Sequence, residues 1–214
     1  MKIFSKNQLQ RYPIYLKFFK EVEASGQKYI SSPAIASVLG YSEEQIRKDL
    51  QTVSNDAGRP KKGREVKKLI ETLENFLGYS EPIKAAVIGV GHLGVALMNY
   101  PNFSDMGLAI VAGFDIDQNK IGKEVAGKHI YSTEEMEEIL PKFDINIIIL
   151  TTPSKCAQEV ADKAIRAGAL AIWNFVPAHL QIPSHIVIEN VNLASSLAIL
   201  SHNLNSLMRL RKSI

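Results

Sequence analysis

Residues 89–94 constrain this chain more than any other segment, because their glycines follow the pattern G-x-G-x-x-G directly after a short apolar run. The six residues are Gly89, Val90, Gly91, His92, Leu93 and Gly94. Residues 84–88 predict a strand and residues 92–99 a helix, the context in which this pattern binds a dinucleotide. The first glycine permits a tight turn, the second lets backbone approach a pyrophosphate, and the third lets helix and strand pack closely. We therefore expect a Rossmann-type sheet with its ligand at this loop.

A carboxylate follows at the spacing that this motif requires. Residues 108–114 predict the next strand, which ends at Asp115, 21 residues after Gly94. A carboxylate there accepts hydrogen bonds from ribose hydroxyls and repels a 2′-phosphate, which favours NADH and NAD+ over their phosphorylated counterparts. The alternative is that Asp115 only begins a loop.

Strands and helices continue to alternate up to residue 189. Residues 132–140 and 155–167 predict helices, and residues 145–150, 170–175 and 185–189 predict strands. The uninterrupted apolar strand 145–150 is typical of a parallel sheet buried on both faces. Ligands bind at the carboxyl ends of such strands. The candidate ligand residues at these ends are Thr151, Thr152, Pro153, Asn174 and Phe175. Phe175 is equally well explained as a core residue.

The first 80 residues carry most of the positive charge. They contain 14 Lys plus Arg against 9 Asp plus Glu, whereas the remaining residues contain 11 against 13. A basic segment joined to a mildly acidic one suggests a nucleic-acid module attached to a second domain. Ordinary surface charge is the alternative.

Helix signals in this basic segment predict a helix-turn-helix. A first helix covers residues 7–24, with a start or bend at Pro13, and a second covers 32–39, with Ser32 as its N-cap. Ser42 opens a third helix with Gln45 as capping-box partner, after a link of only three residues. Residues 65–77 predict a fourth helix.

The third helix presents residue types that contact DNA. Gln45 and Arg47 can bond base edges, and Lys48 suits a phosphate. The loop 55–64 behind it reads as a wing that lies on the DNA backbone or in the minor groove. Its four cations are Arg59, Lys61, Lys62 and Arg64. The alternative is a solvated linker.

Residues 192–211 predict a C-terminal helix with leucines at spacings of four and three. They are Leu193, Leu197, Leu200, Leu204 and Leu207. Such a seam requires a partner and favours a homodimer, although packing on the chain's own sheet is the alternative.

Composition and sequence patterns favour a cytoplasmic protein without a metal site. The single cysteine fits a reducing cytoplasm, and residues 1–40 show no secretory pattern. No apolar run is long enough to span a membrane, and the five histidines lack metal-ligand spacing.

Five segments together resemble the Rex family of redox-sensing transcriptional repressors, over nearly the whole chain. They are Ser31-Ser32, Gln45-Ile46-Arg47-Lys48-Asp49-Leu50, the glycine loop with Asn99-Tyr100-Pro101, Gly113-Phe114-Asp115-Ile116-Asp117, and Ile172-Trp173-Asn174-Phe175-Val176-Pro177. The resemblance implies an α/β protein with an N-terminal winged helix-turn-helix domain and a Rossmann-like parallel sheet. It also implies a swapped C-terminal helix.

The resemblance further implies a homodimer that binds an inverted-repeat operator and leaves it when NADH rises, with NAD+ competing for the same site. It places Ser31 and Ser32 at DNA and Tyr100 in the switch. Where the family pairs a first-helix arginine with an acid before the last helix, this chain has Lys17 and Asn192. A Lys–Asn pair lacks a bidentate, charge-assisted contact, so we expect NADH-driven release to be altered.

We expect three segments: a DNA-binding domain at 1–80, an NAD(H)-binding domain at 81–190 and a dimerisation helix at 191–214. Two other functions fit parts of the pattern, a repressor that senses CoA or another nucleotide and a small NAD-dependent dehydrogenase. The dehydrogenase would need a proton relay and a substrate domain, and no His–Asp or Lys–Tyr pair stands out as a relay.

Overall fold

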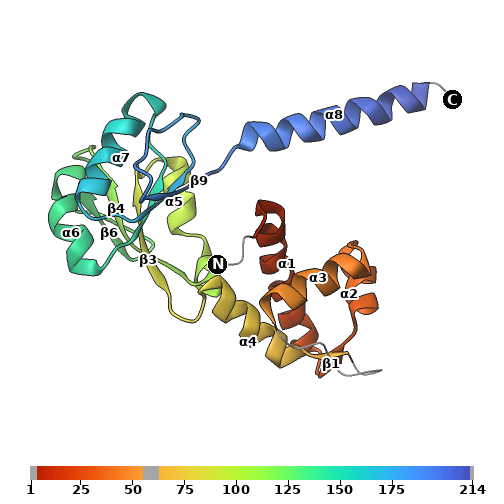
Figure 1. The fold of residues 1–214 in the computed structure, drawn as a ribbon. Helices are drawn as coiled ribbons and strands as arrows, with labels where there is room; N and C mark the ends of the chain where they lie inside the picture. Colours follow the sequence, from red (N-terminus) through yellow and green to blue (C-terminus); the bar gives the residue numbers. More distant parts are fainter. Residues whose placement is uncertain (1–3, 55–62, 213–214) are drawn as a thin grey trace. The chain divides into compact units, whose positions relative to one another are not determined.

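The computed structural model describes residues 4–54 and 63–212 (Figure 1). The chain divides into two compact units. The first comprises Met1–Pro82 with Asp105–Gly107, and the second comprises Ile83–Ser104 with Leu108–Ile214. Each unit has its own hydrophobic core.

The first unit consists of four helices and a two-stranded antiparallel sheet within its described residues (Figure 1). The elements are α1 (Lys6–Ala24), β1 (Tyr29–Ile30), α2 (Ser32–Leu39), α3 (Glu43–Val53), β2 (Arg64–Glu65) and α4 (Val66–Leu77). Apolar residues at helical spacing on α1, α3 and α4 meet in the core, where Phe19, Leu50 and Leu73 are fully buried. Gly40 ends α2 in the left-handed conformation, so the two helices of the predicted motif follow one another closely.

Two predicted helix starts differ from the structure. α1 runs through Pro13 without a break because the residues on both sides of it, Tyr12, Tyr15 and Leu16, are anchored in the core. The N-cap of α2 is Ser31 rather than Ser32, since the Ser31 hydroxyl accepts the N–H of Ala34 at 3.3 Å.

The second unit contains a seven-stranded sheet in the order β5-β6-β4-β3-β7-β8-β9. The strands are β3 (Ile83–Ile88), β4 (Leu108–Asp115), β5 (Glu124–Val125), β6 (Lys128–Ser132), β7 (Ile147–Leu150), β8 (Ala171–Asn174) and β9 (Val187–Asn190). All neighbours are parallel except β5 and β6. The six parallel strands have the order of a Rossmann fold, with its switch point beside β3. β5 and β6 are strands that the sequence analysis did not predict.

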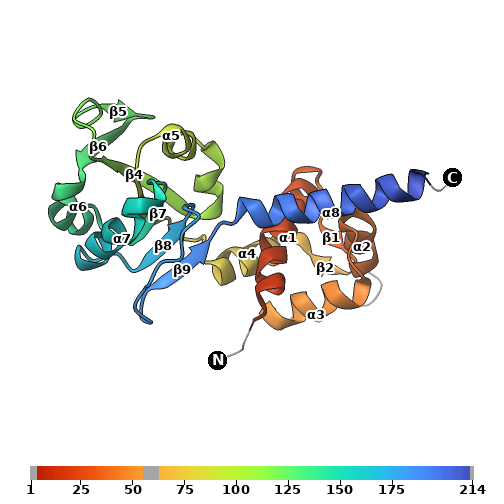
Figure 2. The ribbon, with the colours of Figure 1, turned by 90° about the horizontal axis from the view of Figure 1, so that it is seen from above.

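Helices cover both faces of the sheet. They are α5 (His92–Met98), η1 (Pro101–Met106), η2 (Thr133–Glu135), α6 (Met136–Phe143), η3 (Ser154–Cys156) and α7 (Ala157–Arg166). Ile88 of β3 packs with α6 and α7 on one face, while its neighbour Val87 packs with Met98 of α5 on the other. Figure 2 shows α5 apart from α6 and α7. The double burial explains the uninterrupted apolar strand β7.

The last helix, α8 (Leu193–Lys212), is exposed at every position from 193 to 211. Leu200 is 64% exposed and Leu204 is 52% exposed. The leucine seam is therefore not packed on this chain's own sheet. Among the helices that the structure describes, none is both long and apolar enough to cross a membrane.

Candidate nucleotide site and nucleic-acid interface

A cavity of about 700 Å³ lies at the carboxyl ends of β3, β4 and β7. It brings together six residues of the predicted nucleotide site: Gly89, Gly91, Asp115, Thr151, Thr152 and Pro153. The sequence analysis did not identify its other lining residues, which are Ile88, Ile116, Lys120, Thr133, Glu134, Cys156, Glu159, Val160 and Lys163. The cavity is within the usual size range of cofactor sites, about 300–1,000 Å³.

The glycine loop has the conformation that the motif predicts. Gly89 has φ +91°, and a Cβ there would stand 3.0 Å from the carbonyl of Thr151. A Cβ on Gly94 would lie 2.3 Å from the carbonyl oxygen of Gly89. At Gly91, the N-cap of α5, a Cβ would meet nothing within 4 Å, so this glycine leaves open space beside the cavity. Gly89 and Gly94 are therefore required by the turn and its packing, and Gly91 leaves room for a ligand.

Asp115 is buried and accepts four hydrogen bonds. Oδ2 accepts from the Val90 N–H at 2.8 Å and from Lys120 Nζ at 2.9 Å. Oδ1 accepts from the N–H groups of Ile116 and Asp117 at 2.8 and 3.0 Å. Burial by itself would raise the pKa of Asp115, but the donors, led by the Asp117 N–H, outweigh it and hold the pKa below the ordinary value. To bond to the Asp115 carboxylate, a ribose hydroxyl would have to displace one of these four donors or share an oxygen with it. Lys120 is the one side-chain donor among the four, and its side chain is 37% exposed.

The two threonines after β7 differ in how they are satisfied. The Thr151 hydroxyl donates to the carbonyl of Gly89 at 2.7 Å and so holds the glycine loop. Oγ1 of Thr152 is buried and has no hydrogen-bond partner among the described residues. A buried hydroxyl without a partner is unfavourable, so the cavity contains a group that a polar ligand would satisfy.

Seven predicted cofactor residues do not line this cavity, and two of them, Val90 and Gly94, are buried within the glycine loop itself. Asn174 is only 1% exposed, and its amide bonds to Asn190, Val176 and Ala178. It therefore holds the end of the sheet together. Phe175 lines a separate cavity of about 530 Å³ beside Asn192. Tyr100 is 45% exposed and lines a third, of about 290 Å³. His92 and Leu93 are exposed at the start of α5.

The predicted recognition helix α3 has Ser42 as its N-cap, and the Ser42 hydroxyl accepts the N–H of Gln45 at 3.2 Å. This is the N-cap half of the predicted capping box, while the side chain of Gln45 turns toward Arg11. Arg47 and Lys48 are exposed on α3, and Ser31 is exposed on α2. These three side chains are available for contact, whereas Ser32, which follows Ser31, is half-buried.

The proposed wing is described only in part. Arg59, Lys61 and Lys62 lie outside the described residues. Arg64 is on β2, where it is 5% exposed and pairs with Ile30 of β1. Its burial argues against the phosphate contact predicted for it.

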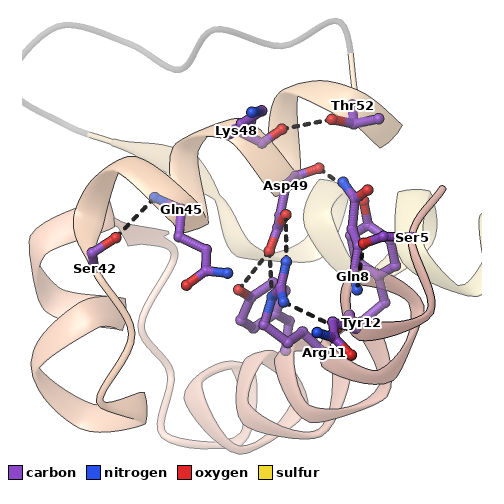
Figure 3. A network of polar contacts seen from close by, with 11 residues as sticks. Ser5, Gln8, Arg11, Tyr12, Ser42, Gln45, Lys48, Asp49 and Thr52 are labelled. Atoms are coloured by element: carbon purple, nitrogen blue, oxygen red, sulfur yellow. Dashed lines mark hydrogen bonds and ion pairs between the residues drawn. The ribbon is translucent and has the colours of Figure 1, made fainter. Parts of the chain in front are cut away.

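Sequence reasoning missed a polar cluster behind α3 (Figure 3). Arg11 Nε donates to Asp49 Oδ2 at 2.7 Å and Nη2 donates to Oδ1 at 2.9 Å, while the Tyr15 hydroxyl donates to Oδ2 at 2.9 Å. The Tyr12 hydroxyl donates to the Asp49 carbonyl at 3.1 Å. The only signal in the sequence was a carboxylate at an inward position of an amphipathic helix.

Electrostatics in this cluster follow from burial and from the carboxylate. The hydrogen bond to Asp49 raises the pKa of Arg11, so the guanidinium stays charged. Burial raises the pKa of Tyr12 to about 12 and also raises that of Tyr15, so both hydroxyls keep their protons. The cluster is therefore one fixed ion pair with neutral phenol donors.

The predicted switch residues occur in both units. Lys17 is exposed on α1, and the Asn192 side chain accepts the N–H of Ser195 at 3.0 Å at the start of α8. No group of three or more His, Cys, Asp or Glu side chains in the described residues is arranged to hold a metal ion.

A helix-turn-helix unit with exposed cations and a Rossmann sheet with a glycine-loop cavity define a class, that of DNA-binding regulators with a nucleotide-binding domain. A family model described as a putative DNA-binding protein N-terminus matches residues 4–51, and one described as a CoA binding domain matches residues 80–178.

Whole-chain relatives identify the family. The redox-sensing transcriptional repressor Rex of Treponema denticola is 40% identical over 205 residues, which cover 96% of this chain and 97% of that protein. The crystal structure of RSP, a Rex-family repressor, in complex with β-NAD+ and operator DNA matches with a TM-score of 0.90 and 32% identity, covering 99% of this chain and 97% of that one. RSP in complex with β-NADH matches with a TM-score of 0.87 over all of both chains, also at 32% identity. The chain belongs to the Rex family of redox-sensing transcriptional repressors, which confirms the resemblance and the predicted fold class.

Proposed function

We propose that this chain binds operator DNA as a homodimer and that its affinity for the operator falls when NADH occupies the glycine-loop cavity. The observation that carries this proposal is the cavity lined by Gly89, Gly91 and Asp115 in a chain whose other unit contains a helix-turn-helix. The RSP complexes with β-NAD+ and operator DNA and with β-NADH support it.

The residues of the cavity fit a dinucleotide. Gly91 leaves space where a pyrophosphate can approach backbone, and Thr152 has a buried hydroxyl that needs a partner. Asp115 is the proposed partner of the adenosine ribose hydroxyls, and Lys120 is bonded to its carboxylate. Bound NADH and NAD+ differ in the charge of the nicotinamide ring, and this difference is the redox signal. We assign Asn174 to bracing the sheet and keep Tyr100 and Phe175 as candidates for the nicotinamide side.

On the DNA side, we propose that Gln45 and Arg47 read bases and that Lys48 binds a phosphate, because all three lie near the start of α3. Ser31 and Ser32 start α2 and are proposed to bind the backbone. The cations Arg59, Lys61 and Lys62 are proposed to extend the contact along the duplex.

We propose that α8 forms the dimer interface. Its seam is exposed in the single chain, and a twofold dimer places two recognition helices about one DNA turn, 34–36 Å, apart. We accordingly divide the chain into residues 1–80, 81–190 and 191–214, with the last segment exchanged between protomers.

Release requires that NADH bind one dimer shape more tightly than the other, since equal binding would shift nothing. Lys17, Tyr100 and Asn192 are the proposed switch residues. A lysine and an asparagine make a weaker contact than the arginine–acid pair of the family, so we propose a smaller NADH effect here. We further propose that the chain regulates transcription in the cytoplasm and catalyses no reaction.

The experiment is a titration of operator binding across NADH to NAD+ ratios, with CoA and NADPH as alternative ligands. We expect NADH to weaken binding and CoA to have no effect. Release by CoA would identify the other sensor class, and steady NADH oxidation with a small carbonyl compound would identify an enzyme. Unchanged operator affinity at saturating NADH would overturn the proposal.

A further inference from the structure

Arg11 uses all five of its N–H donors on groups of its own unit. An arginine has one donor on Nε and two on each terminal nitrogen. Nε and Nη2 bond to the two oxygens of Asp49, and Nη1 donates to the carbonyl of Asn7 at 3.0 Å. One donor on Nη1 and one on Nη2 remain, and both face the side-chain amide of Gln45 at 3.2 Å.

These last two donors determine the orientation of the Gln45 amide. Figure 3 draws the amide nitrogen toward Arg11, where donors would face donors. With the amide turned by 180°, Oε1 accepts from both Nη1 and Nη2. Such orientations are assigned from the hydrogen bonds they make, and only this one satisfies the guanidinium. The two lone pairs of Oε1 are then both used.

Arg11 itself cannot turn away to release the amide. Its side chain is only 14% exposed, and it forms a two-point ion pair with Asp49, whose side chain is 4% exposed. Tyr15 adds a third bond to the same carboxylate. The charge of Arg11 is permanent, since its hydrogen bond to Asp49 raises its pKa further. Arg11 is therefore a fixed support behind the third residue of α3.

The consequence concerns which bases Gln45 can read. A glutamine that recognises adenine in the usual two-point way donates to N7 and accepts from the 6-amino group with its oxygen. Here the oxygen is occupied by Arg11, and only the amide N–H groups remain for the DNA. A donor can bond N7 or O6 of guanine, O4 of thymine, or N7 of adenine alone.

We propose that Arg11 is a positioning residue that restricts Gln45 to hydrogen-bond acceptors on base edges and prevents the two-point contact with adenine. This inference rests on the proposed function, because it assumes that α3 lies in the major groove. It adds a base preference that is set by a residue that does not itself contact the DNA.

The position read by Gln45 is found first, with the full chain. Duplexes are selected from a random pool by the wild type and by Gln45→Ala, and the base pair whose preference disappears in Gln45→Ala is the one that Gln45 reads. Gln51→Ala is the matched control, since Gln51 is exposed on the same helix. We expect Gln51→Ala to keep the preference at that pair.

Base analogues then test the donor at that pair. Replacing the acceptor atom, for example N7 by C–H, should weaken wild-type binding about tenfold. Removing a 6-amino group from adenine there should leave binding unchanged. A tenfold loss on removing the amino group would show that Oε1 reads the base and would overturn the inference without any variant of the protein.

Arg11→Lys tests the support itself. Lysine keeps a positive charge beside Asp49 but lacks the paired Nη donors, so the amide is free to turn. We expect Arg11→Lys to accept adenine at this pair through its 6-amino group, with unchanged affinity for random DNA. An unaltered base preference in a folded Arg11→Lys would overturn the inference alone. Absence of any selected sequence for the wild type would instead overturn the proposed function, and this inference with it.

Discussion

Oδ2 of Asp115 accepts the backbone N–H of Val90 at 2.8 Å, so the carboxylate that ends β4 also braces the glycine loop that follows β3. The two residues are 25 positions apart. The bond couples the proposed ribose contact of Asp115 to the shape of the loop, because one side chain would serve both.

Asp115→Asn should therefore weaken NADH binding by about tenfold and destabilise the second unit by about 1–3 kcal/mol. The amide nitrogen of the asparagine would face two existing donors, either the two backbone N–H groups that bond Oδ1 or the Val90 and Lys120 donors that bond Oδ2. Those two hydrogen bonds would be lost. Calorimetric titration and urea unfolding measure the two effects. Asp117→Asn is the matched control, because the Asp117 side chain does not line the cavity and bonds only to Asn119 and, at 4.0 Å, to Lys120 among the described residues. Equal NADH affinity in wild type and Asp115→Asn would contradict the assignment.

The lowered pKa of Asp115 predicts a pH dependence. A carboxyl whose pKa is lower in the folded than in the unfolded chain stabilises the fold above the unfolded value, about 3.9, and this contribution is lost as pH falls through the folded value. The stability difference between wild type and Asp115→Asn should thus be constant from pH 7 to 5 and shrink below about 4. Unfolding at a series of pH values measures it, and a difference that grew on acidification would have the wrong sign.

Lys120 should reduce discrimination against a 2′-phosphate, because its ammonium lies 2.9 Å from the Asp115 carboxylate and offsets the negative charge. Lys120→Met should lower NADPH affinity relative to NADH by about fivefold, on the order of 1 kcal/mol for a partly exposed charge. Competition titrations measure the ratio. Lys123→Met, which removes an exposed lysine that does not line the cavity, should leave it unchanged.

Asp49→Ala should destabilise the first unit by about 3 kcal/mol, because it leaves the Arg11 guanidinium and the Tyr15 hydroxyl without their shared acceptor. Thermal unfolding followed by helical circular dichroism measures the loss. Glu44→Ala, on the exposed side of the same helix, should cost less than about 0.5 kcal/mol. Similar melting temperatures for the two variants would show that the ion pair contributes little.

Leu200→Glu should convert the proposed homodimer to a monomer, since it places a charge in the middle of the α8 seam. His202→Glu introduces the same residue two positions away, outside the spacing of the seam, and should remain dimeric. Light scattering during size-exclusion chromatography distinguishes the two masses. A dimeric Leu200→Glu would place the interface elsewhere.

Local patterns were sufficient for much of the fold and for six of the fifteen residues that line the glycine-loop cavity. The glycine pattern, the apolar strands and Asp115 depend on residues close in sequence, so the loop and its neighbours Thr151 and Thr152 were correctly brought together. The short strands β5 and β6 escaped prediction because they contain only two and five residues and little alternation. The helix at residues 7–24 was predicted, but its possible start at Pro13 was wrong, because tertiary packing of the neighbouring residues outweighed a local helix breaker.

The sequence by itself determined the helix-turn-helix, the Rossmann sheet that follows it and the position of the glycine loop, because these depend on motifs whose spacing is set by helix and strand geometry. Only the tertiary structure decided which side chains are free to act. It placed Lys120 on Asp115, enclosed Asn174 within the sheet, and set Arg11 behind Gln45 across 34 residues of chain. Whether all donors and acceptors of a side chain are bonded depends on its neighbours in space. Residues as far apart in sequence as Arg11 and Gln45 produce no sequence periodicity from which their contact could be predicted.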